Sequence, residues 1–321
     1  MNILKTLAHR LLQRKREEKV ELLDVETMTR RRLTIVLALA VGLASLPLII
    51  TYLLLVLSSF SNEAGMLTLE DIFRTSYSLK PWIDFFMGKV APAAGRLYTP
   101  WEIISIIVNT LIVALGVTAV VIFTSVLAGY AFSRMRFPGR RSLMQLLILL
   151  HAFPGVALII AVYAVYVWSL AGIPRDYQWA YAFFYVILAR ASLEIPMSIW
   201  IMKGFFDQIS WEVEWSALID GASRFRVWWQ IVLPQVKPGI AALAIFAFLA
   251  GWEDFIYVWA FLKPRNIYTL ATFIEEQVRS LETAYFPVIA AAGTLYLIPT
   301  ILFFIFTQKL LLEAYSGGVK G

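Results

Sequence analysis

The sequence predicts an all-α, polytopic membrane protein that crosses the bilayer six times. Of its 321 residues, 60% are hydrophobic and only 16% are charged, whereas soluble domains carry roughly 25% charged residues. A helix that crosses the hydrocarbon core needs about 20 consecutive apolar residues, and six segments of this chain meet that requirement. They are expected at about residues 33–60, 103–132, 143–170, 179–202, 240–262 and 286–312.

The distribution of Lys and Arg predicts that both termini are cytoplasmic (N-in and C-in). Segments on the N-terminal side of the membrane hold 19 of the 28 Lys and Arg residues, and the opposite side holds eight, spread over longer loops. Four of the 19 fill the short segment 134–141, and positive charge in short loops is the most reliable mark of the cytoplasmic side. The segments 61–102, 171–178 and 263–285 are therefore expected to face outside.

Residues 1–32 are expected to form a cytoplasmic amphipathic segment, and residues 33–321 the transmembrane domain. The segment is too long and too charged for a signal peptide, and a full span follows it. Apolar residues recur at helical spacing with basic residues between them, which is typical of a helix lying on the inner membrane face. These apolar residues are Ile3, Leu4, Leu7 and Leu11.

Composition argues against several functional classes. The chain has no cysteine and only two histidines, so we expect neither a disulfide framework nor a metal site. The isoelectric point near 9.4 is explained by the positive-inside bias rather than by nucleic acid binding. There is no Gly-x4-Gly-Lys-Ser/Thr cradle for nucleotide phosphates and no Ser/His/Asp set. We therefore expect no catalysis and no cofactor bound by this chain.

Pro47, Pro154, Pro196 and Pro299 each fall within an expected span. Proline lacks a backbone donor, so each is expected to kink its helix or open it locally. Kinks suit a protein that changes shape, but proline is also ordinary in membrane helices. His151, just before Pro154, is open to two interpretations, a proton relay or the commoner helix-packing histidine.

The segment 207–238 lies between two expected spans and is too polar and long for a simple turn. Ser210 is a good N-cap, and Glu212 and Glu214 fall in the first turn, where the helix dipole favours carboxylates. Gly221 is suited to ending this short helix. The apolar residues of the helix recur at spacings of three and four, namely Trp211, Trp215, Leu218 and Ile219.

A second short helix is expected after the Gly221 turn. Ser223 is its N-cap, it runs to Val232, and Pro234 and Pro238 stop it before the fifth span. The two elements together predict a helix–turn–helix across the cytoplasmic mouth of the membrane domain.

The spacing within this element matches a known pattern. Asp220-Gly221-Ala222 is followed, nine residues after the glycine, by Ile231-Val-Leu-Pro234. This arrangement resembles the Glu-Ala-Ala loop of the inner-membrane permease subunits of binding-protein-dependent ABC importers, and more narrowly their maltose-type carbohydrate branch. Where the family has Glu-Ala-Ala, this chain has Trp215-Ser216-Ala217, and Glu214 stands one place early.

Three further stretches resemble the same family, in the same order along the chain. Asn109-Thr-Leu-Ile-Val resembles the opening of the family's second span, and Trp252-Glu253-Asp254-Phe255 resembles the branch's Trp-Asn-Asp-Phe. The ending Gly317-Gly-Val-Lys-Gly321 resembles the C-terminal tail that reaches between the ATPase subunits. With the six spans, the resemblance covers most of the chain.

The resemblance implies a permease subunit of an ATP-driven importer that takes up a sugar or oligosaccharide. The implied partners are an extracytoplasmic solute-binding protein, a second permease subunit of a different chain, an ATPase dimer that binds ATP and Mg, and membrane lipid. No nucleic acid is implied. The implied ATPase-coupling residues are Glu212, Glu214, Trp215, Ser216, Ala217, Asp220, Gly221, Ala222, Ile231, Leu233 and Pro234, with Gly317, Gly318, Val319, Lys320 and Gly321 in the tail. Because Trp215 replaces the family Glu, Glu212 or Glu214 is the candidate substitute in the ATPase contact.

Charged residues inside expected spans mark either a pathway or internal ion pairs, because an unpaired charge in the membrane is costly. Arg190 and Glu194 lie four residues apart on one helix face and are expected to pair. Glu253 and Asp254 in the fifth span have aromatic neighbours, which suits sugar binding but also suits an aromatic belt near the outer surface. The candidate pathway residues are Arg190, Glu194, Trp252, Glu253, Asp254 and Tyr257.

The outer loops are long enough to contact a soluble partner, and the other interpretation is a solvated helix on the membrane. Leu67–Ser76 is expected to be helix-like, and a helix is expected around Glu275, Glu276, Arg279 and Glu282. The alternative function is an ion-coupled secondary transporter that uses the intramembrane charges. That class is built from inverted repeats with interrupted helices, and no clear repeat is found.

Overall fold

The computed structural model describes residues 32–90, 98–279 and 285–317, with side chains described through residue 305. The described chain is helical, apart from an isolated bridge between Ser61 and Tyr77. After the helix Arg32–Ser58 come α2 (Lys80–Phe86), α3 (Pro100–Arg134), α4 (Arg140–His151), α5 (Gly155–Leu170), α6 (Gln178–Asp207), α7 (Trp211–Ile219), α8 (Arg224–Val227), α9 (Leu233–Gln235), α10 (Lys237–Trp252), α11 (Ile256–Phe261), α12 (Leu270–Arg279) and α13 (Phe286–Gly317). The expected amphipathic segment 1–32 lies outside the described residues except for Arg32.

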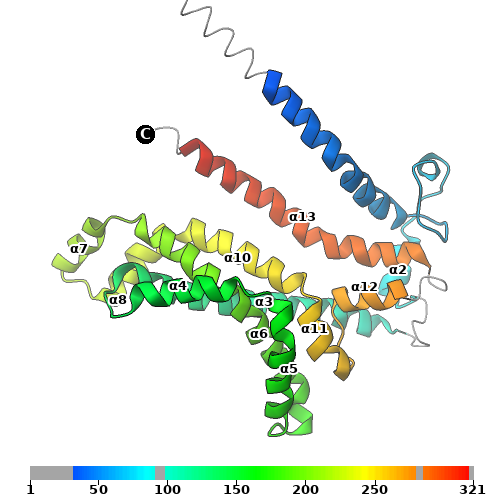
Figure 1. Cartoon of the computed structure of the whole chain (residues 1–321). Coiled ribbons are helices and arrows are strands. Elements are labelled where there is room, and N and C mark those ends of the chain that lie inside the picture. Colours follow the sequence, from blue (N-terminus) through cyan, green and yellow to red (C-terminus); the bar gives the residue numbers. More distant parts are fainter. Residues whose placement is uncertain (1–31, 91–97, 280–284, 318–321) are drawn as a thin grey trace, which may run out of the picture.

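The all-helical class is confirmed, with four to six candidate membrane spans among the described residues. Four helices are long and apolar enough to cross a membrane, and two bent helix pairs raise the number to six if each pair is one span. The helix Arg32–Ser58 has no buried residue in its most apolar stretch and stands apart from the other helices (Figure 1). The end that carries α7 and α8 lies opposite the end that carries α2 and α12 (Figure 1).

The expected third span, 143–170, is not one continuous helix. It divides into α4 and α5, which meet at an angle of 97°, and α5 runs away from the main helix layer (Figure 1). Pro154 is the residue before α5 and has an extended backbone (φ −63°, ψ 120°). His151 at the end of α4 lies against α6, with Nδ1 3.1 Å from the Leu193 carbonyl oxygen. The break therefore combines a residue that cannot donate a backbone hydrogen bond with a contact that fixes the end of α4.

Proline alone does not decide where a helix breaks. Pro196 and Pro299 both lie inside continuous helices, α6 and α13. The predicted end of the second short helix at Val232 is three residues early, because the helical segment continues through a π-turn at Trp228–Val232 and through α9 to Gln235. The bend of 72° falls between Gln235 and Lys237, between the two predicted prolines, and Pro238 lies in the first turn of α10, where a missing N–H costs least.

The expected fifth span, 240–262, is interrupted. α10 ends at Trp252, three residues without helical structure follow, and α11 begins at Ile256. Asp254 stands before α11 and accepts backbone N–H groups from Tyr257 and Val258, at 3.0 and 3.1 Å. Its carboxylate therefore caps the start of α11 from the position before the N-cap residue Phe255, and Asp254 does not lie on a continuous helix.

The core of the membrane domain is the contact of α3 with α6 and α10. Valines and alanines fill it, among them Val117, Val186 and Ala247. Glycines bring the backbones together, as small residues do between membrane helices. A β-carbon added to Gly251 of α10 would lie 2.8 Å from the α-carbon of Ala114 on α3.

The segments at the end that carries α2 and α12 form a second core around Phe85, Ile103 and Phe273. Asn109 and Thr110 attach α12 to α3: the Asn109 amide donates to the Tyr268 carbonyl (3.0 Å) and the Thr110 hydroxyl accepts the Leu270 N–H (2.9 Å). The expected helix at Leu67–Ser76 is wrong, since only a 3-10 turn, Asp71–Phe73, forms there.

The predicted helix around Glu275 is confirmed as α12, and Glu282 lies outside the described residues. Lys263 and Arg279 both pair with the Glu275 carboxylate. Burial works to raise the pKa of Glu275, but the hydrogen bond and charge of Lys263, helped by Arg279, outweigh it and lower the pKa below its ordinary value.

The α3–α6 contact yields a stability prediction. A β-carbon at Gly129 would lie 2.8 Å from the β-carbon of Met202 and 3.1 Å from the Lys203 backbone nitrogen. We expect Gly129→Ala to lower the free energy of unfolding by about 1–3 kcal/mol, the usual cost of overpacking, measured as thermal unfolding in detergent. The matched control is Gly204→Ala on α6, where nothing lies within 4 Å and alanine favours a helix by up to about 1 kcal/mol. Equal stability of the two variants would contradict the close packing of these helices.

Candidate functional site

The polar segment between α6 and α10 forms the predicted helical hairpin. The Ser210 hydroxyl accepts the Glu212 N–H (3.2 Å) and begins α7, and Gly221, with φ 85°, ends the turn after it. The Ser223 hydroxyl accepts the Arg226 N–H (3.3 Å) and begins α8. Both predicted N-caps and the predicted glycine turn are therefore confirmed.

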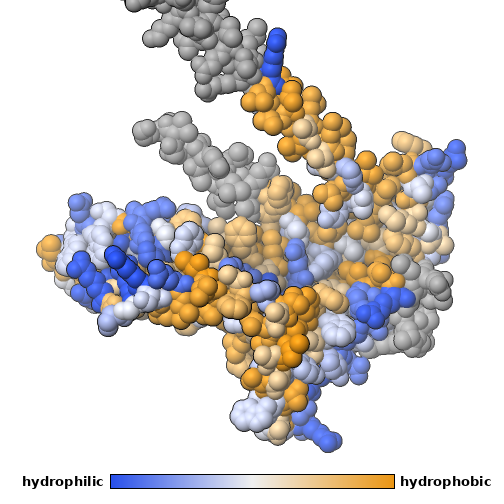
Figure 2. Space-filling view, in the orientation of Figure 1, coloured by the Kyte–Doolittle hydropathy of each residue, from blue (hydrophilic) through white to orange (hydrophobic). Residues whose placement is uncertain are grey.

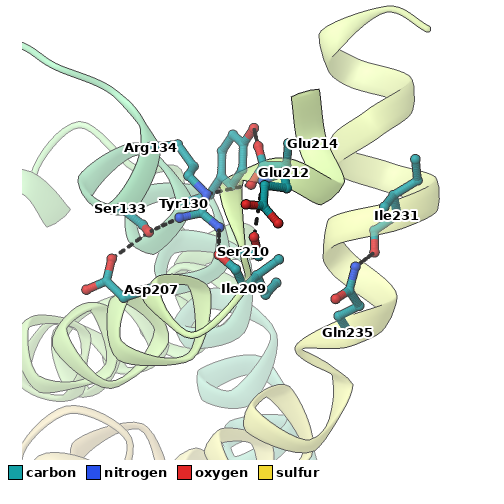
Figure 3. Close-up of polar contacts among 10 residues, drawn as sticks. All are labelled: Tyr130, Ser133, Arg134, Asp207, Ile209, Ser210, Glu212, Glu214, Ile231 and Gln235. Carbon is teal, nitrogen blue, oxygen red and sulfur yellow. Dashed lines mark hydrogen bonds and ion pairs between the residues drawn. The ribbon is translucent and has the colours of Figure 1, made fainter. Parts of the chain in front are cut away.

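A buried ion pair joins this hairpin to the membrane helices. The Arg134 guanidinium at the end of α3 donates through Nε to the Glu214 carboxylate on α7, at 2.5 Å (Figure 3). Only 5% of the Arg134 side chain and 8% of the Glu214 side chain are exposed. Removing one partner of such a pair leaves an uncompensated buried charge, which costs about 3–5 kcal/mol. The two helices are thus held in one relative position.

Further hydrogen bonds and a ring contact surround the pair. The Tyr130 hydroxyl donates to Glu214 (3.2 Å), and Arg134 Nη2 donates to the Ile209 carbonyl (2.7 Å). The Trp211 ring covers the Arg134 guanidinium, 4.5 Å from ring centre to the guanidinium carbon. On the same turn of α3, the Ser133 hydroxyl donates to Asp207 (2.6 Å) at the end of α6 (Figure 3).

The expectation that Glu214 faces a partner protein is corrected by this geometry. Glu214 points inward because Arg134 and Tyr130 hold it there, and its carboxylate is not on the outer surface. Trp215, at the position of the family Glu, is 55% exposed and faces outward. Of the other residues predicted here, Glu212, Ser216, Asp220 and Gly221 are exposed, and Ala217 and Ala222 are half-buried.

The second arm of the hairpin contributes less outward surface. Ile231 and Leu233 are half-buried, Pro234 is exposed, and Val232 between them is fully buried. The Gln235 amide donates to the Ile231 carbonyl (2.9 Å, Figure 3), which belongs to the π-turn. Of the predicted tail, Gly317 is the last residue of α13, and Gly318, Val319, Lys320 and Gly321 lie outside the described residues.

A second polar group surrounds the break between α10 and α11. Arg190 of α6 pairs with Glu194 (2.8 Å), as predicted, and also with Asp254 (3.0 Å), which was not foreseen. Arg190 Nε donates to the Ala250 carbonyl (3.1 Å) in the last turn of α10. Arg190 thus satisfies a carbonyl at the end of α10, and the Asp254 carboxylate satisfies two N–H groups at the start of α11.

This polar group lines an open cavity of about 900 Å³. Arg190, Glu194, Glu253, Asp254 and Tyr257, all predicted pathway residues, lie on its wall. The Tyr257 hydroxyl donates to the Gly155 carbonyl (2.9 Å) at the start of α5. Carboxylates and a guanidinium beside apolar walls suit a small polar molecule.

Trp252 does not belong to this wall. It is buried, stacks between Phe248 and Tyr296, and donates its indole N–H to the Tyr296 carbonyl (3.0 Å). Its neighbour Glu253 accepts a hydrogen bond from Thr300 of α13 (2.9 Å). The aromatic residues around the carboxylates therefore join α10 to α13, and only Tyr257 among those predicted faces the cavity.

Sequence reasoning missed the residues that receive these side chains. Arg134 and Tyr130 were assigned only to the positive-inside count and to a span, and Thr300 was not singled out. One available signal was the i,i+4 placement of Tyr130 and Arg134 at the cytoplasmic end of a span, on one helix face. In the part of the chain that the structure describes, no three His, Cys, Asp or Glu side chains are grouped as a metal site.

The buried pair predicts that substitution of Glu214 lowers the stability of the protein strongly, whereas substitution of a neighbouring exposed Glu does not. We expect Glu214→Gln to destabilise the attachment of α7 by about 3 kcal/mol, because the Arg134 charge is left buried without a counter-charge. Thermal unfolding in detergent measures the effect. Glu212→Gln, two residues away and exposed, is the matched control and should stay within about 0.5 kcal/mol of the parent. Combining Glu214→Gln with Arg134→Gln should cost less than the sum of the single changes, and strict additivity would contradict the pairing.

The break between α10 and α11 predicts an order of effects. Arg190→Met should destabilise most, by about 3–5 kcal/mol, because two carboxylates and a carbonyl lose their partner. Asp254→Asn should cost less, since Asn also caps helices, and Glu194→Gln least, because Glu194 is the more exposed carboxylate. The same unfolding measurement ranks the three variants. If Arg190→Met left the stability unchanged, the pairing would be contradicted and each charge at the break would be solvated by itself.

Comparison with known proteins agrees with these features. Residues 121–315 match the family described as the binding-protein-dependent transport system inner membrane component. The chain is 33% identical over 283 residues to the maltodextrin transport system permease protein MalD of Streptococcus pneumoniae, covering 87% of this chain and 93% of the relative. It is 31% identical over 281 residues to the galactooligosaccharides transport system permease protein GanQ of Bacillus subtilis, covering 87% and 93%.

A solved structure shares the fold. A chain of a bacterial ABC transporter involved in the import of the acidic polysaccharide alginate superposes with a TM-score of 0.62 at 19% identity, covering 87% of this chain and 96% of the other. The family carries no ATPase activity of its own and resides in the inner membrane as a multi-pass subunit, which fits the helical hairpin and the apolar spans described above. The chain belongs to the inner-membrane permease components of binding-protein-dependent ABC transport systems.

Proposed function

We propose that this chain is one permease subunit of an ATP-driven importer that translocates a sugar or oligosaccharide delivered by an extracytoplasmic binding protein. The observation that carries the proposal is the hairpin α7–α8, whose outward face is exposed while its inner face is fixed to α3 by Glu214 and Arg134. A force applied to α7 is thereby transmitted to a membrane helix. The sugar class is supported by the relatives, which are named for maltodextrin and galactooligosaccharides.

We infer that both termini and the hairpin are cytoplasmic, because the basic residues gather on that side. In this orientation α2 and α12 lie outside, where a binding protein docks. Residues 1–32 form a cytoplasmic segment, and residues 33–321 form the transmembrane domain.

The outward face of α7 docks on an ATPase dimer, which binds ATP and Mg. Trp215 is the centre of this contact, with Glu212, Ser216 and Asp220 around it. Aromatic side chains dominate protein–protein contacts when they become buried, so Trp215 replaces an ionic contact by an apolar one. The tail Gly317–Gly321 extends the same contact toward the ATPase subunits.

The cavity at the break between α10 and α11 is the substrate pathway on this chain. Sugar hydroxyls donate hydrogen bonds to carboxylates, which Glu194, Glu253 and Asp254 provide. Sugar C–H faces pack on aromatic rings, and Tyr257 provides one. A second permease subunit of a different chain completes the pathway. It covers part of the apolar surface of the helix Arg32–Ser58, and lipid covers the rest. An ion-coupled mechanism is not favoured, because family membership assigns transport to a multi-subunit system.

Reconstitution tests the proposal. The tagged chain, co-expressed with its ATPase, second permease and binding protein, is placed in liposomes with ATP inside, and uptake of labelled maltodextrins is measured. We expect uptake to require ATP and all the subunits. Ion-gradient-driven uptake by the chain alone would contradict the proposal, and ATP-driven uptake of a different solute would retain the mechanism but reject the sugar.

The proposed ATPase contact predicts the effect of Trp215. We expect Trp215→Ala to weaken ATPase retention on the purified permease by roughly tenfold or more, because loss of a central aromatic anchor costs about 2 kcal/mol or more. Trp179→Ala, an equally exposed tryptophan at the start of α6, is the matched control and should retain the ATPase. Full retention by Trp215→Ala would place the contact elsewhere.

A further inference from the structure

A second cavity lies where α3 ends and α4 begins, apart from the pathway and from the outward face of α7. Its volume is about 750 Å³. It is formed by the end of α3, the connecting segment, the first turns of α4 and one residue of α6. Its lining includes Arg136, Gly139, Arg140, Arg141, Ser142 and Lys203.

Four cations line this cavity and no carboxylate does. Lys203 pairs with Asp207 one turn away on α6. Among the described residues, no salt bridge joins Arg136, Arg140 or Arg141 to an acidic side chain. Three guanidinium groups therefore leave a positive field in one concavity, and guanidinium is the group that binds phosphate oxygens bidentately.

The start of α4 adds backbone donors to the same cavity. Gly139, with φ 78°, precedes the helix and provides no side-chain cap. The N–H groups of Arg141 and Ser142 have no backbone or side-chain acceptor in the described chain. A helix start of this kind favours an anion, and here it coincides with the three arginines and the Ser142 hydroxyl.

The surface next to the cavity is apolar, which favours a phospholipid over a soluble phosphate as the anion. From the first turns of α4 onward, Leu143, Leu146 and Leu149 are exposed. Figure 2 shows hydrophilic residues over the end that carries α7 and α8 and a hydrophobic band running from there along the membrane helices. A soluble phosphate would use the cations alone, whereas a phospholipid also uses this apolar surface for its acyl chains.

We propose that this cavity binds the phosphate head group of an anionic phospholipid, with the acyl chains along the exposed leucines of α4. The positive-inside bias places basic residues on one side of a membrane, but it does not require three arginines to converge on one cavity without carboxylates. Basic pockets between membrane helices are sites for anionic head groups. Placement in the cytoplasmic leaflet rests on the proposed orientation, whereas binding itself does not.

Native mass spectrometry of the full-length chain in its assembled transporter tests the proposal. The detergent-stripped complex is titrated with phosphatidylglycerol, with phosphatidylcholine, and with inorganic phosphate. We expect saturable binding of phosphatidylglycerol, at least tenfold tighter than phosphatidylcholine, that persists in millimolar inorganic phosphate. Arg136→Gln combined with Arg141→Gln should weaken phosphatidylglycerol binding by about tenfold or more, because two of the four cations that attract the head group are removed.

The control variant combines Arg226→Gln with Lys237→Gln. It removes two exposed cations from the hairpin and from the start of α10, outside the cavity, and should leave the lipid affinity unchanged. An equal loss in both double variants, or no preference for the anionic lipid, would overturn the site. Displacement of the lipid by millimolar inorganic phosphate would overturn the lipid as its ligand. Circular dichroism of each variant verifies that a loss of binding is not a loss of folding.

Discussion

The burial of Glu214 is the constraint on which the cytoplasmic end of this molecule depends. A carboxylate on a short surface helix ordinarily faces water, and Glu214 is removed from it only because Arg134 ends α3 at that point. Arg134 in turn is tolerable in its buried position only because of Glu214 and the Ile209 carbonyl. A buried pair of this kind contributes little net stability, but it permits only one arrangement of its two helices. That arrangement determines which residues of α7 remain outside, Trp215 among them.

The same physics operates at the break between α10 and α11. An interrupted helix leaves carbonyl and N–H groups without partners in the helix. Arg190 satisfies a carbonyl at the end of α10, and Asp254 satisfies two N–H groups at the start of α11. Packed helices connect the polar group around Glu214 with the polar group around Arg190. Glu214 holds α3, α3 packs on α6 through Gly129, and α6 carries Arg190. The hairpin and the cavity are thus joined by one contiguous set of packed helices, as a subunit driven from outside the membrane requires.

Features with a local cause could be predicted from sequence. The N-caps Ser210 and Ser223, the Gly221 turn and the Arg190–Glu194 pair are set by neighbours within a few residues. Contacts between distant residues could not, and Glu214 and Arg134 are 80 positions apart. The break at Asp254 could have been predicted locally, because Asp three residues before Tyr257 is a helix-capping pattern. The interpretation of Asp254 as a charge within a span did not use this pattern. Proline signals were ambiguous, because Pro154 adjoins a sharp bend whereas Pro196 and Pro299 lie in continuous helices, and packing decides between these outcomes.

The central claim is that α7 and α3 move as one body, and a distance measurement tests it most directly. Because the chain has no cysteine, Ser216→Cys and Phe123→Cys give unique spin-label sites on exposed positions of α7 and α3. Double electron–electron resonance in the assembled transporter then reports the distance between the two spin labels, without nucleotide and with ATP. The account predicts one narrow distance distribution, unchanged by ATP, that broadens when Glu214→Gln is added. A parent distance that shifts with ATP, or that ignores Glu214→Gln, would contradict it.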